Sequence, residues 1–328
     1  MATTVAVTGA SGHIGNVVCR KLIESSHTVR AFYNKDHRPL DGLNLQLVQG
    51  NVLNREDLSR LVNGCDIVIN CAAIISINGD LDGMVFKTNI EGPKNILEAS
   101  IDHGVKKIVH ISSVHAVTEL PHSLPYDESR PYKNSDAYAY DYSKAQGEQL
   151  LLLAARKGST EIVIIRPSCA IGPFDFKPSK MGAALKDFYL QKIPFLPEGG
   201  YDLVDVRDLV QSIINAISNG RNGEIYLLSG KYYSLKDLAR AINGVTGKKV
   251  PQKVIPYRLL KMLLPFVSMY AHINKSAPSF TKESINALIN GHPNMDNTKA
   301  RIELNHQCRP LEETLNDFFA WQKENQLL

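Results

Sequence analysis

The stretch TTVAVTGASGHIG at residues 3–15 decides the fold of this chain. Its first part, Thr3–Thr8, is a short run rich in β-branched residues, which indicates a buried strand. Glycines at 9, 12 and 15 follow, and helically spaced apolar residues from Ile14 to Leu22 predict a helix. A glycine-rich turn between a strand and a helix is typical of a dinucleotide-binding site. Its bare backbone can approach a pyrophosphate, and the helix N-terminus attracts the negative charge. The alternative is a strand–helix corner that binds nothing.

Length and composition indicate an ordinary globular protein. The 328 residues, 44% apolar and 21% charged, suffice for one large or two smaller domains. The net charge of +4 is spread out, so no nucleic-acid surface is expected. The five cysteines form no CxxC pair and the ten histidines no zinc-ligand spacing, which predicts a reducing, cytoplasmic location and no metal. No apolar run reaches the ~20 residues of a membrane span, and a strand at residue 3 leaves no room for a signal peptide.

Strands and helices alternate along the first half of the chain. Strands are predicted at 27–33, 45–48, 66–70, 106–111 and 161–166 and a last one at 224–228, with helices at 54–61 and 81–103 among those between them. This alternation predicts an α/β fold with a Rossmann-type, doubly wound parallel sheet and helices on both faces.

The pattern changes after Pro167, where prolines and glycines surround one predicted helix at 179–191. We expect a nucleotide-binding domain at 1–170, to which 203–229 returns, and a smaller, mostly helical substrate region at 171–202 and 230–328. The stretch 255–271 is apolar but broken by Arg258, Lys261 and Pro265, so a substrate lid or a core helix is expected there and membrane contact is not.

Residues that suit ligand binding follow several predicted strands. The second strand leads into Asn34, Lys35 and Arg38, whose positive charges suit a 2′-phosphate, so NADP is favoured over NAD unless this is a solvated loop. The fourth strand ends in the small residues 71–73, and the fifth ends in Ser112-Ser113. In open α/β sheets, ligands bind at these carboxyl ends.

A Tyr/Lys pair stands in a predicted helix at 136–157, with Asp136 as its N-cap. Tyr140 and Lys144 are four positions apart and therefore share a helix face. An ammonium beside a phenol favours the phenolate and lowers a pKa that is about 10 in the free residue, so the pair suits proton transfer. Taken alone, the pair is more typical of a solvated Tyr and Lys, and the motifs upstream favour the catalytic interpretation.

These motifs together resemble the extended short-chain dehydrogenase/reductase family, of the NAD-dependent epimerase/dehydratase type. The resemblance rests on 8–15, 70–73, Ser112-Ser113 and Tyr140-x-x-Ser143-Lys144-x-x-Gly147-Glu148 in one order. Arg166-Pro167, 171–173 and 205–208 resemble later family motifs, and it extends over nearly the whole chain. Stretches 200–202, 278–281 and 309–314 look most like the branch that holds dihydroflavonol reductases and hydroxysteroid dehydrogenases.

The resemblance implies a role for each matching residue. Tyr140 would be the proton donor or acceptor, Lys144 would bind the nicotinamide ribose and hold the pKa of Tyr140 down, and Ser113, or failing it Ser112, would bind the substrate oxygen. Asn89 would belong to a proton relay or merely kink its helix. Asn51 stands where the family commonly has an adenine-binding Asp, and nothing catalytic is assigned to Asp205. The expected cofactor-binding residues are Gly9, Ser11, Gly12, His13, Ile14, Gly15, Asn34, Lys35, Arg38, Asn51, Val52, Cys71, Ala72, Ala73, Asn89, Tyr140, Lys144 and Pro167.

The sequence thus predicts an NAD(P)-dependent oxidoreductase for a ketone or secondary alcohol of an apolar small molecule, and leaves a homodimer open. The apolar substrate is inferred from aromatic and Met residues after Pro167, which could instead form the core of the smaller region: Phe174, Phe176, Met181, Phe188, Tyr189, Phe195, Leu196, Met262, Leu263, Phe266 and Met269. One alternative is a nucleoside-diphosphate-sugar epimerase or dehydratase that retains its cofactor, with Lys177, Lys180 and Lys186 for the diphosphate. A non-catalytic nucleotide-binding scaffold is the third, although it would need none of Ser113, Tyr140 and Lys144.

Overall fold

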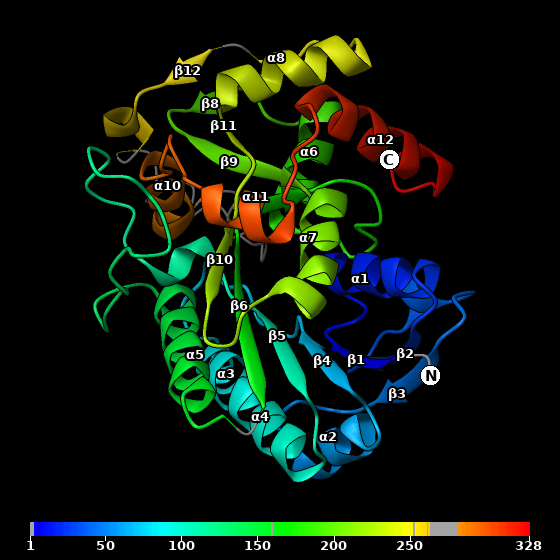
Figure 1. Cartoon of the computed structure of the whole chain (residues 1–328). Helices are drawn as coiled ribbons and strands as arrows, with labels where there is room; N and C mark the ends of the chain where they lie inside the picture. The colour runs from blue at the N-terminus through cyan, green and yellow to red at the C-terminus, as the bar shows by residue number, and fades with distance from the viewer. Residues whose placement is uncertain (1–2, 159, 252, 261, 263–280) are drawn as a thin grey trace.

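A parallel seven-stranded sheet forms the centre of the structure, a computed structural model that describes residues 3–158, 160–251, 253–260, 262 and 281–328 (Figure 1). Its strand order is β3-β2-β1-β4-β5-β6-β10, so the order reverses between β1 and β4. The strands are β1 Thr4–Thr8, β2 Thr28–Tyr33, β3 Gln46–Gln49, β4 Ile67–Asn70, β5 Lys107–Ile111, β6 Glu161–Pro167 and β10 Ile225–Leu228. This confirms the predicted doubly wound Rossmann-type sheet.

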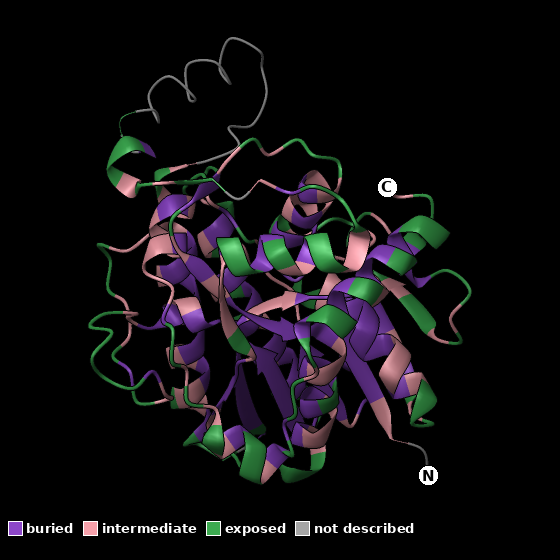
Figure 2. Ribbon diagram, turned by 90° about the horizontal axis from the view of Figure 1, so that it is seen from above, coloured by how far each residue is buried: buried purple, intermediate pink, exposed green. Residues whose placement is uncertain are grey.

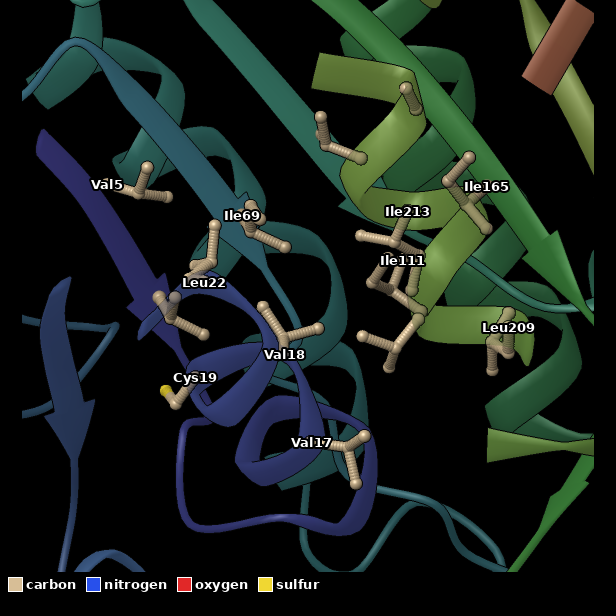
Figure 3. Packing of buried hydrophobic residues seen from close by; sticks show 14 of the residues in the cluster. Val5, Val17, Val18, Cys19, Leu22, Ile69, Ile111, Ile165, Leu209 and Ile213 are labelled. Carbon is tan, nitrogen blue, oxygen red and sulfur yellow. The ribbon is translucent and has the colours of Figure 1, made fainter. Parts of the chain in front are cut away.

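Helices cover both faces of this sheet. One face carries α1 (His13–Glu24), α7 (Val206–Asn219) and α11 (Thr298–Leu304); the other carries α2 (Arg55–Val62), α4 (Gly92–Asp102) and α5 (Ala139–Ala155). Alternate strand residues serve the two sides: Val5 and Ile69 pack under α1 and α7, whereas Ala6 faces the other layer (Figure 3). Side chains alternate across a strand, so a strand between two helical layers is buried on both faces, as Figure 2 shows.

The smaller region caps the carboxyl end of the sheet. It contains a three-stranded sheet, β11-β9-β7, and a two-stranded pair, β12-β8. Its strands are β7 Cys169–Ile171, β8 Leu196–Pro197, β9 Gly200–Asp205, β11 Lys231–Ser234 and β12 Val254–Ile255; its helices are α6 Lys180–Tyr189, α8 Leu235–Thr246, α10 Lys282–Ile289 and α12 Leu311–Glu324. Met181, Phe188 and Leu196 lie in its core, so these three side chains fill the region and do not line a pocket.

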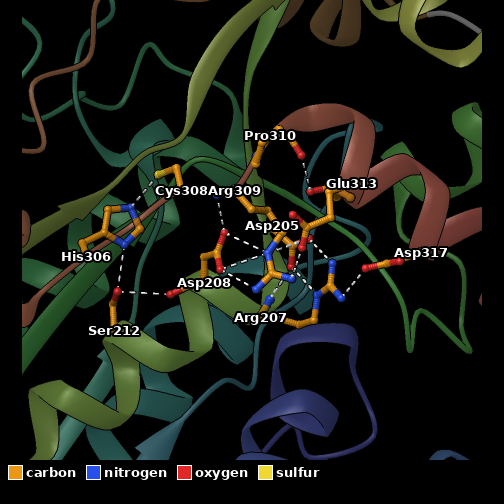
Figure 4. A network of polar contacts seen from close by, with 11 residues as sticks. Asp205, Arg207, Asp208, Ser212, His306, Cys308, Arg309, Pro310, Glu313 and Asp317 are labelled. Atoms are coloured by element: carbon orange, nitrogen blue, oxygen red, sulfur yellow. Dashed lines mark hydrogen bonds and ion pairs between the residues drawn. The ribbon is translucent and has the colours of Figure 1, made fainter. Parts of the chain in front are cut away.

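A charged network fastens this region to α7 (Figure 4). Arg207 Nη2 donates to Asp205 Oδ2 at 2.7 Å and Arg207 Nη1 to Asp317 Oδ2 at 2.5 Å. Arg309 Nη2 donates to Asp208 Oδ1 at 2.7 Å. Paired, hydrogen-bonded guanidinium and carboxylate groups satisfy one another. Asp205, to which no catalytic role was given, is therefore part of a joint between α7 and α12.

Several predicted boundaries are wrong. Helix α5 begins at Ala139 with Tyr138 as N-cap, so Asp136 does not cap it. The predicted helix 81–103 starts late, because Leu81, Asp82 and Gly83 have positive φ; a short α3 (Met84–Phe86) and a π-helical turn, η2 (Lys87–Glu91), then lead into α4. Strand β9 pairs with β7 and β11 and not with the central sheet, and β11 follows the strand predicted to be last. Most of 255–271 lies outside the described residues.

Candidate active site

The glycine-rich turn after β1 lies against the end of β4. Gly9 has φ of +63°, and a Cβ there would lie 2.8 Å from the backbone of Cys71 and Ala72. A Cβ at Gly15 would lie 2.3 Å from the carbonyl oxygen of Gly9, so α1 packs directly over the turn. Only glycine permits these two approaches. The turn and residues 71–73 therefore meet where the strand order reverses.

The start of α1 fits a phosphate. Gly12 is its N-cap and supplies no side-chain hydrogen bond, so no side chain caps the first amides of the helix. Ser11, Gly12, His13 and Ile14 are all partly or fully exposed. An uncapped helix N-terminus on a glycine turn suits the pyrophosphate of a dinucleotide. The ring of His13 is held to the carbonyl oxygen of Pro173 at 3.0 Å, which joins this turn to the segment after β7.

A buried chain of polar side chains, which the sequence analysis missed, supports the turn from below. Thr8 Oγ1 donates to Asn70 Oδ1 at 2.7 Å, and Asn70 Nδ2 lies 2.9 Å from His110 Nδ1. Ala72 N also donates to Asn70 Oδ1, at 3.2 Å. Burial lowers the pKa of His110 well below its usual value, so the ring is neutral. The sequence signal for this chain was a polar residue at or next to the carboxyl end of each of three neighbouring strands, β1, β4 and β5.

The residues expected around the adenosine are partly engaged. Arg38 Nε and Nη2 each donate to Asp36 at 2.8 Å, and this hydrogen bonding lowers the pKa of Asp36 to about 2. Asn51 Oδ1 accepts from the backbone of Leu53 at 3.0 Å. Asn34 and Asn51 line one surface hollow beside β3. The structure thus places both residues at one hollow, while Arg38 is turned to its own loop.

Other expected cofactor residues occupy less open positions. Val52 is buried in the core beneath α4. Pro167 ends β6, and Cys71, Ala72 and Ala73 remain partly exposed after β4. Burial raises the pKa of the Cys71 thiol to about 12, so this thiol is neutral.

Ser113, Tyr140 and Lys144 meet at the end of β5. Ser113 caps the 3₁₀ turn η3 (Val114–Ala116), and its side chain lies near enough to Tyr140 of α5 to lower the pKa of the phenol. Tyr140 is 8% and Lys144 3% exposed, so the predicted alternative of a solvated pair is wrong. Lys144 Nζ donates to the carbonyl oxygen of Ile111 at 2.8 Å. Ser113, α5 and the end of β5 thus meet at one buried point.

Burial dominates the pKa values of this pair. It raises the pKa of Tyr140 to about 12, partly offset by the nearby hydroxyl of Ser113, and lowers that of Lys144 to about 8. The predicted lowering of the Tyr140 pKa by Lys144 is not found, because burial outweighs other effects on the phenol and Lys144 Nζ is hydrogen-bonded to Ile111 O. At neutral pH the phenol therefore holds its proton.

Asn89 joins three segments. Its Oδ1 accepts from Ile74 N at 2.8 Å, and its Nδ2 donates to Ile74 O at 3.0 Å and to Ser143 Oγ at 2.9 Å. It lies in the π-helical turn, where its carbonyl oxygen occupies the space of a Cβ at Gly147, 2.4 Å away. Gly147 of the motif therefore lets the bulged helix approach α5, a contact that the sequence did not reveal.

Ser112 faces away from Tyr140. Its Oγ donates to Glu148 Oε2 at 2.7 Å, and Glu148 also accepts from Arg166 Nη2 at 2.6 Å and Tyr132 OH at 2.7 Å. Ser112 is therefore not available as the alternative to Ser113. The end of the motif, Gly147-Glu148, belongs to the supporting structure and not to the open side of the site.

None of the helices in the described part of the chain has both the length and the apolar character that a membrane span requires.

The model of the NAD dependent epimerase/dehydratase family matches residues 5–229. "Sterol demethylase protein B" of Methylococcus capsulatus is 28% identical over 99% of this chain and 100% of its own. A protein described as a candidate dihydroflavonol 4-reductase of Synechocystis is 32% identical over 78% of this chain and 76% of its own. The solved structure of gox2253 has a TM-score of 0.86 at 28% identity, and each chain is covered fully.

Proposed function

We propose that this chain, which belongs to the NAD dependent epimerase/dehydratase family of extended short-chain enzymes, reduces a ketone of an apolar small molecule. The observation that carries the proposal is the burial of Ser113, Tyr140 and Lys144 at the end of β5, with the Ser113 hydroxyl near enough to Tyr140 to lower the pKa of the phenol. Two hydroxyl groups so arranged can both donate to one carbonyl oxygen. A non-catalytic scaffold would have no reason to bury them.

In this proposal Ser113 orients the substrate oxygen and Tyr140 supplies its proton. The pKa of Tyr140, raised to about 12, keeps the phenol protonated at neutral pH, which suits donation to a carbonyl in the reductive direction. The nicotinamide cofactor would supply the hydride. Lys144 would donate to the cofactor ribose, either in place of Ile111 O or in addition to it. From there its ammonium would stabilise the phenolate that Tyr140 becomes after proton transfer.

The same proposal gives each region of the chain a ligand to bind. Residues 1–170 and 203–229 would bind the dinucleotide, with the pyrophosphate at 9–15, the nicotinamide near 71–73, Asn89 and Pro167, and the adenosine near Asn34, Asn51 and Val52. Residues 171–202 and 230–328 would enclose the substrate. NADP is proposed over NAD, because Lys35 follows β2 without any described partner and Arg38 can exchange Asp36 for a phosphate.

The sugar-nucleotide alternative is supported less well. Of the three lysines expected to meet a diphosphate, Lys186 donates to the carbonyl oxygen of Leu327 at the C-terminus. Lys177 lies near Asp36, in the loop after β2 that is proposed to meet the 2′-phosphate of the cofactor. Two of the three lysines expected at a diphosphate are thus engaged elsewhere, which leaves this alternative with less support.

The test is cofactor consumption with two substrate panels. Flat apolar ketones should oxidise one NADPH per ketone reduced, and NADPH should serve better than NADH. Nucleotide sugars should remain unchanged. Conversion of a nucleotide sugar with no net change in free cofactor would replace the reductase by the epimerase, and no turnover of either panel would favour the scaffold.

A further inference from the structure

The positive charge of the chain is concentrated in one stretch. Residues 238–282 contain eight Lys and Arg side chains and no Asp or Glu, although the whole chain has 37 basic and 33 acidic side chains. The other residues therefore hold 29 basic and 33 acidic side chains, a net charge of −4, against +8 for this stretch. The positive charge is thus not evenly spread, and a local surplus of this kind attracts an anionic partner.

Four of these basic side chains are exposed on the smaller region: Lys248, Lys249, Lys253 and Arg258. Within the described part of the chain none of the four forms an ion pair, whereas Arg240 of α8 lies 3.2 Å from Asp237. The segment does contact one carboxylate, that of Glu198, which accepts from the backbone N of Tyr257 at 2.8 Å. The four basic groups therefore remain available to charges outside the protein.

Exposed aliphatic side chains stand among these basic ones. Val254 is 37% exposed, Leu259 44% and Met262 63%. Residues 257–260 form a helical turn in which Leu260 is buried, so that Leu259 faces outward beside Arg258. The sequence favoured a lid or a core helix for 255–271, but in the described part of that stretch apolar side chains lie on the surface. Cationic and aliphatic groups thus share one exposed face.

This face belongs to the outer edge of the smaller region. Strand β12 pairs with β8, with Val254 opposite Leu196, and this pair is separate from the central sheet. In Figure 1, β12 lies at the end of the molecule opposite to α2 and α4. Leu196 N donates to Lys253 O at 2.9 Å, and Gln191 Nε2 donates to Lys249 O at 2.9 Å. The backbone that presents the face is therefore fastened to the rest of the region.

We propose that the exposed face of residues 248–251, 253–260 and 262 binds the surface of an anionic lipid bilayer. Lysine and arginine attract anionic head groups, and aliphatic side chains enter the boundary between the head groups and the acyl chains. A peripheral contact of this kind requires no helix that spans the membrane. It goes beyond the proposed function and does not depend on it, although a bilayer would also concentrate an apolar ketone.

Other anionic partners fit this face less well. Single strands of nucleic acid bind where aromatic side chains stack on the bases beside the cations, and the strongly exposed apolar side chains here are aliphatic. A duplex nucleic acid or an acidic polypeptide would neutralise the cations but would give Val254, Leu259 and Met262 no apolar layer to enter. A bilayer accommodates both kinds of side chain.

Sedimentation of the full chain with lipid vesicles tests this contact. The parent should bind vesicles made of equal parts of phosphatidylcholine and phosphatidylglycerol, should not bind phosphatidylcholine alone, and should bind less as salt is added. Lys253→Gln combined with Arg258→Gln should weaken binding by about 25-fold, about fivefold for each charge removed. The control, Arg156→Gln combined with Lys157→Gln, also removes two exposed basic side chains, at the end of α5, and should leave binding unchanged.

A second variant separates a bilayer from other anionic partners. Leu259→Asn combined with Met262→Gln should weaken vesicle binding by about tenfold or more, because two side chains no longer enter the apolar boundary. Vesicle binding equal to the parent's in this variant would overturn the lipid assignment, as would tighter binding of the parent to a duplex DNA fragment or to polyglutamate.

The remaining outcomes concern the place of the contact. No binding of the parent to anionic vesicles, or equal losses in the patch variant and its control, would overturn the proposal. All substituted side chains are exposed, so the urea unfolding curves should match that of the parent. None of these measurements uses a ketone or NADPH, so a failed reductase would leave this result intact, and the reverse also holds.

Discussion

Helix α5 buries two groups of polar residues and treats them in opposite ways. Glu148 is completely buried, but Ser112, Tyr132 and Arg166 all donate to it, so its charge is matched within the protein. Lys144 one turn earlier and Tyr140 two turns earlier are almost as deeply buried, and burial displaces both of their pKa values. The two groups are buried alike but differ in how completely their polar atoms are hydrogen-bonded. Glu148, fully paired, supports the fold, whereas Tyr140 and Lys144, incompletely paired, remain free to bind a ligand.

Breaking the satisfied group should have the largest effect. Glu148→Gln should lower the free energy of unfolding by about 3–5 kcal/mol, because it leaves the guanidinium of Arg166, itself 1% exposed, without its carboxylate. Urea unfolding measures this. As a control, Glu98→Gln removes a surface carboxylate 3.3 Å from Arg55 and should cost less than about 1 kcal/mol. Equal losses in both variants would mean that the Glu148 network is not a special support.

Removing the buried charge of Lys144 should have the opposite effect on stability. Lys144→Met should raise the free energy of unfolding at neutral pH by on the order of 1–3 kcal/mol, since the folded state no longer buries an ammonium, while abolishing turnover. The pKa of Lys144 is about 8 in the folded chain against 10.5 ordinarily, so the unfolded state binds more protons between these values. Stability of the parent should therefore rise with pH across that interval, and Lys144→Met should flatten the rise. Lys106→Met, at a surface pair with Asp66, is the control; a destabilised Lys144→Met would contradict the account.

A smaller effect is expected at the adenosine end. Replacing Lys35 and Arg38 by Ala should weaken NADP binding by about tenfold and leave NAD binding within about twofold, because only NADP carries the 2′-phosphate. The parent's preference for NADP should shrink at high salt. Cofactor titrations at two ionic strengths decide this. Tighter binding of NAD by the parent would show that Asn34 faces a free ribose hydroxyl.

The smallest expected effect lies at Glu283, on the rim of the site. Burial and the nearby Asp141 raise its pKa to about 7 from 4.5, so the folded state binds more protons than the unfolded state between these values. The contribution of Glu283 to stability should therefore decline as pH rises from 4.5 to 7. Because the group is half exposed, the change should be below about 1 kcal/mol. Glu283→Gln should remove this slope in thermal unfolding; a slope that persists would place it on other groups.

The sequence predicted what depends on local pattern and missed what depends on distant partners. The parallel sheet, the turn at Gly9 and the approach of Ser113 to Tyr140 followed from strand ends and helix spacing. The partners of Glu148 come from three separate segments, so no local pattern reveals them. The direction of the Tyr140 pKa was missed for a related reason: spacing placed Lys144 on the same helix face but could not show that its ammonium is bound to Ile111. Nor could the spacing show how deeply Tyr140 and Lys144 are buried, and burial is what raises the pKa of the phenol.

The central claim, that Tyr140 donates the proton in a reduction, is tested most directly by Tyr140→Phe in the ketone-dependent oxidation of NADPH. The variant removes one hydroxyl without touching Glu148 or its partners, so its unfolding curve and its affinity for NADPH should match those of the parent. Its kcat should fall by about 10²-fold or more, the usual contribution of a general acid. A Tyr140→Phe enzyme that folds, binds NADPH and turns over at the parent's rate would contradict the account.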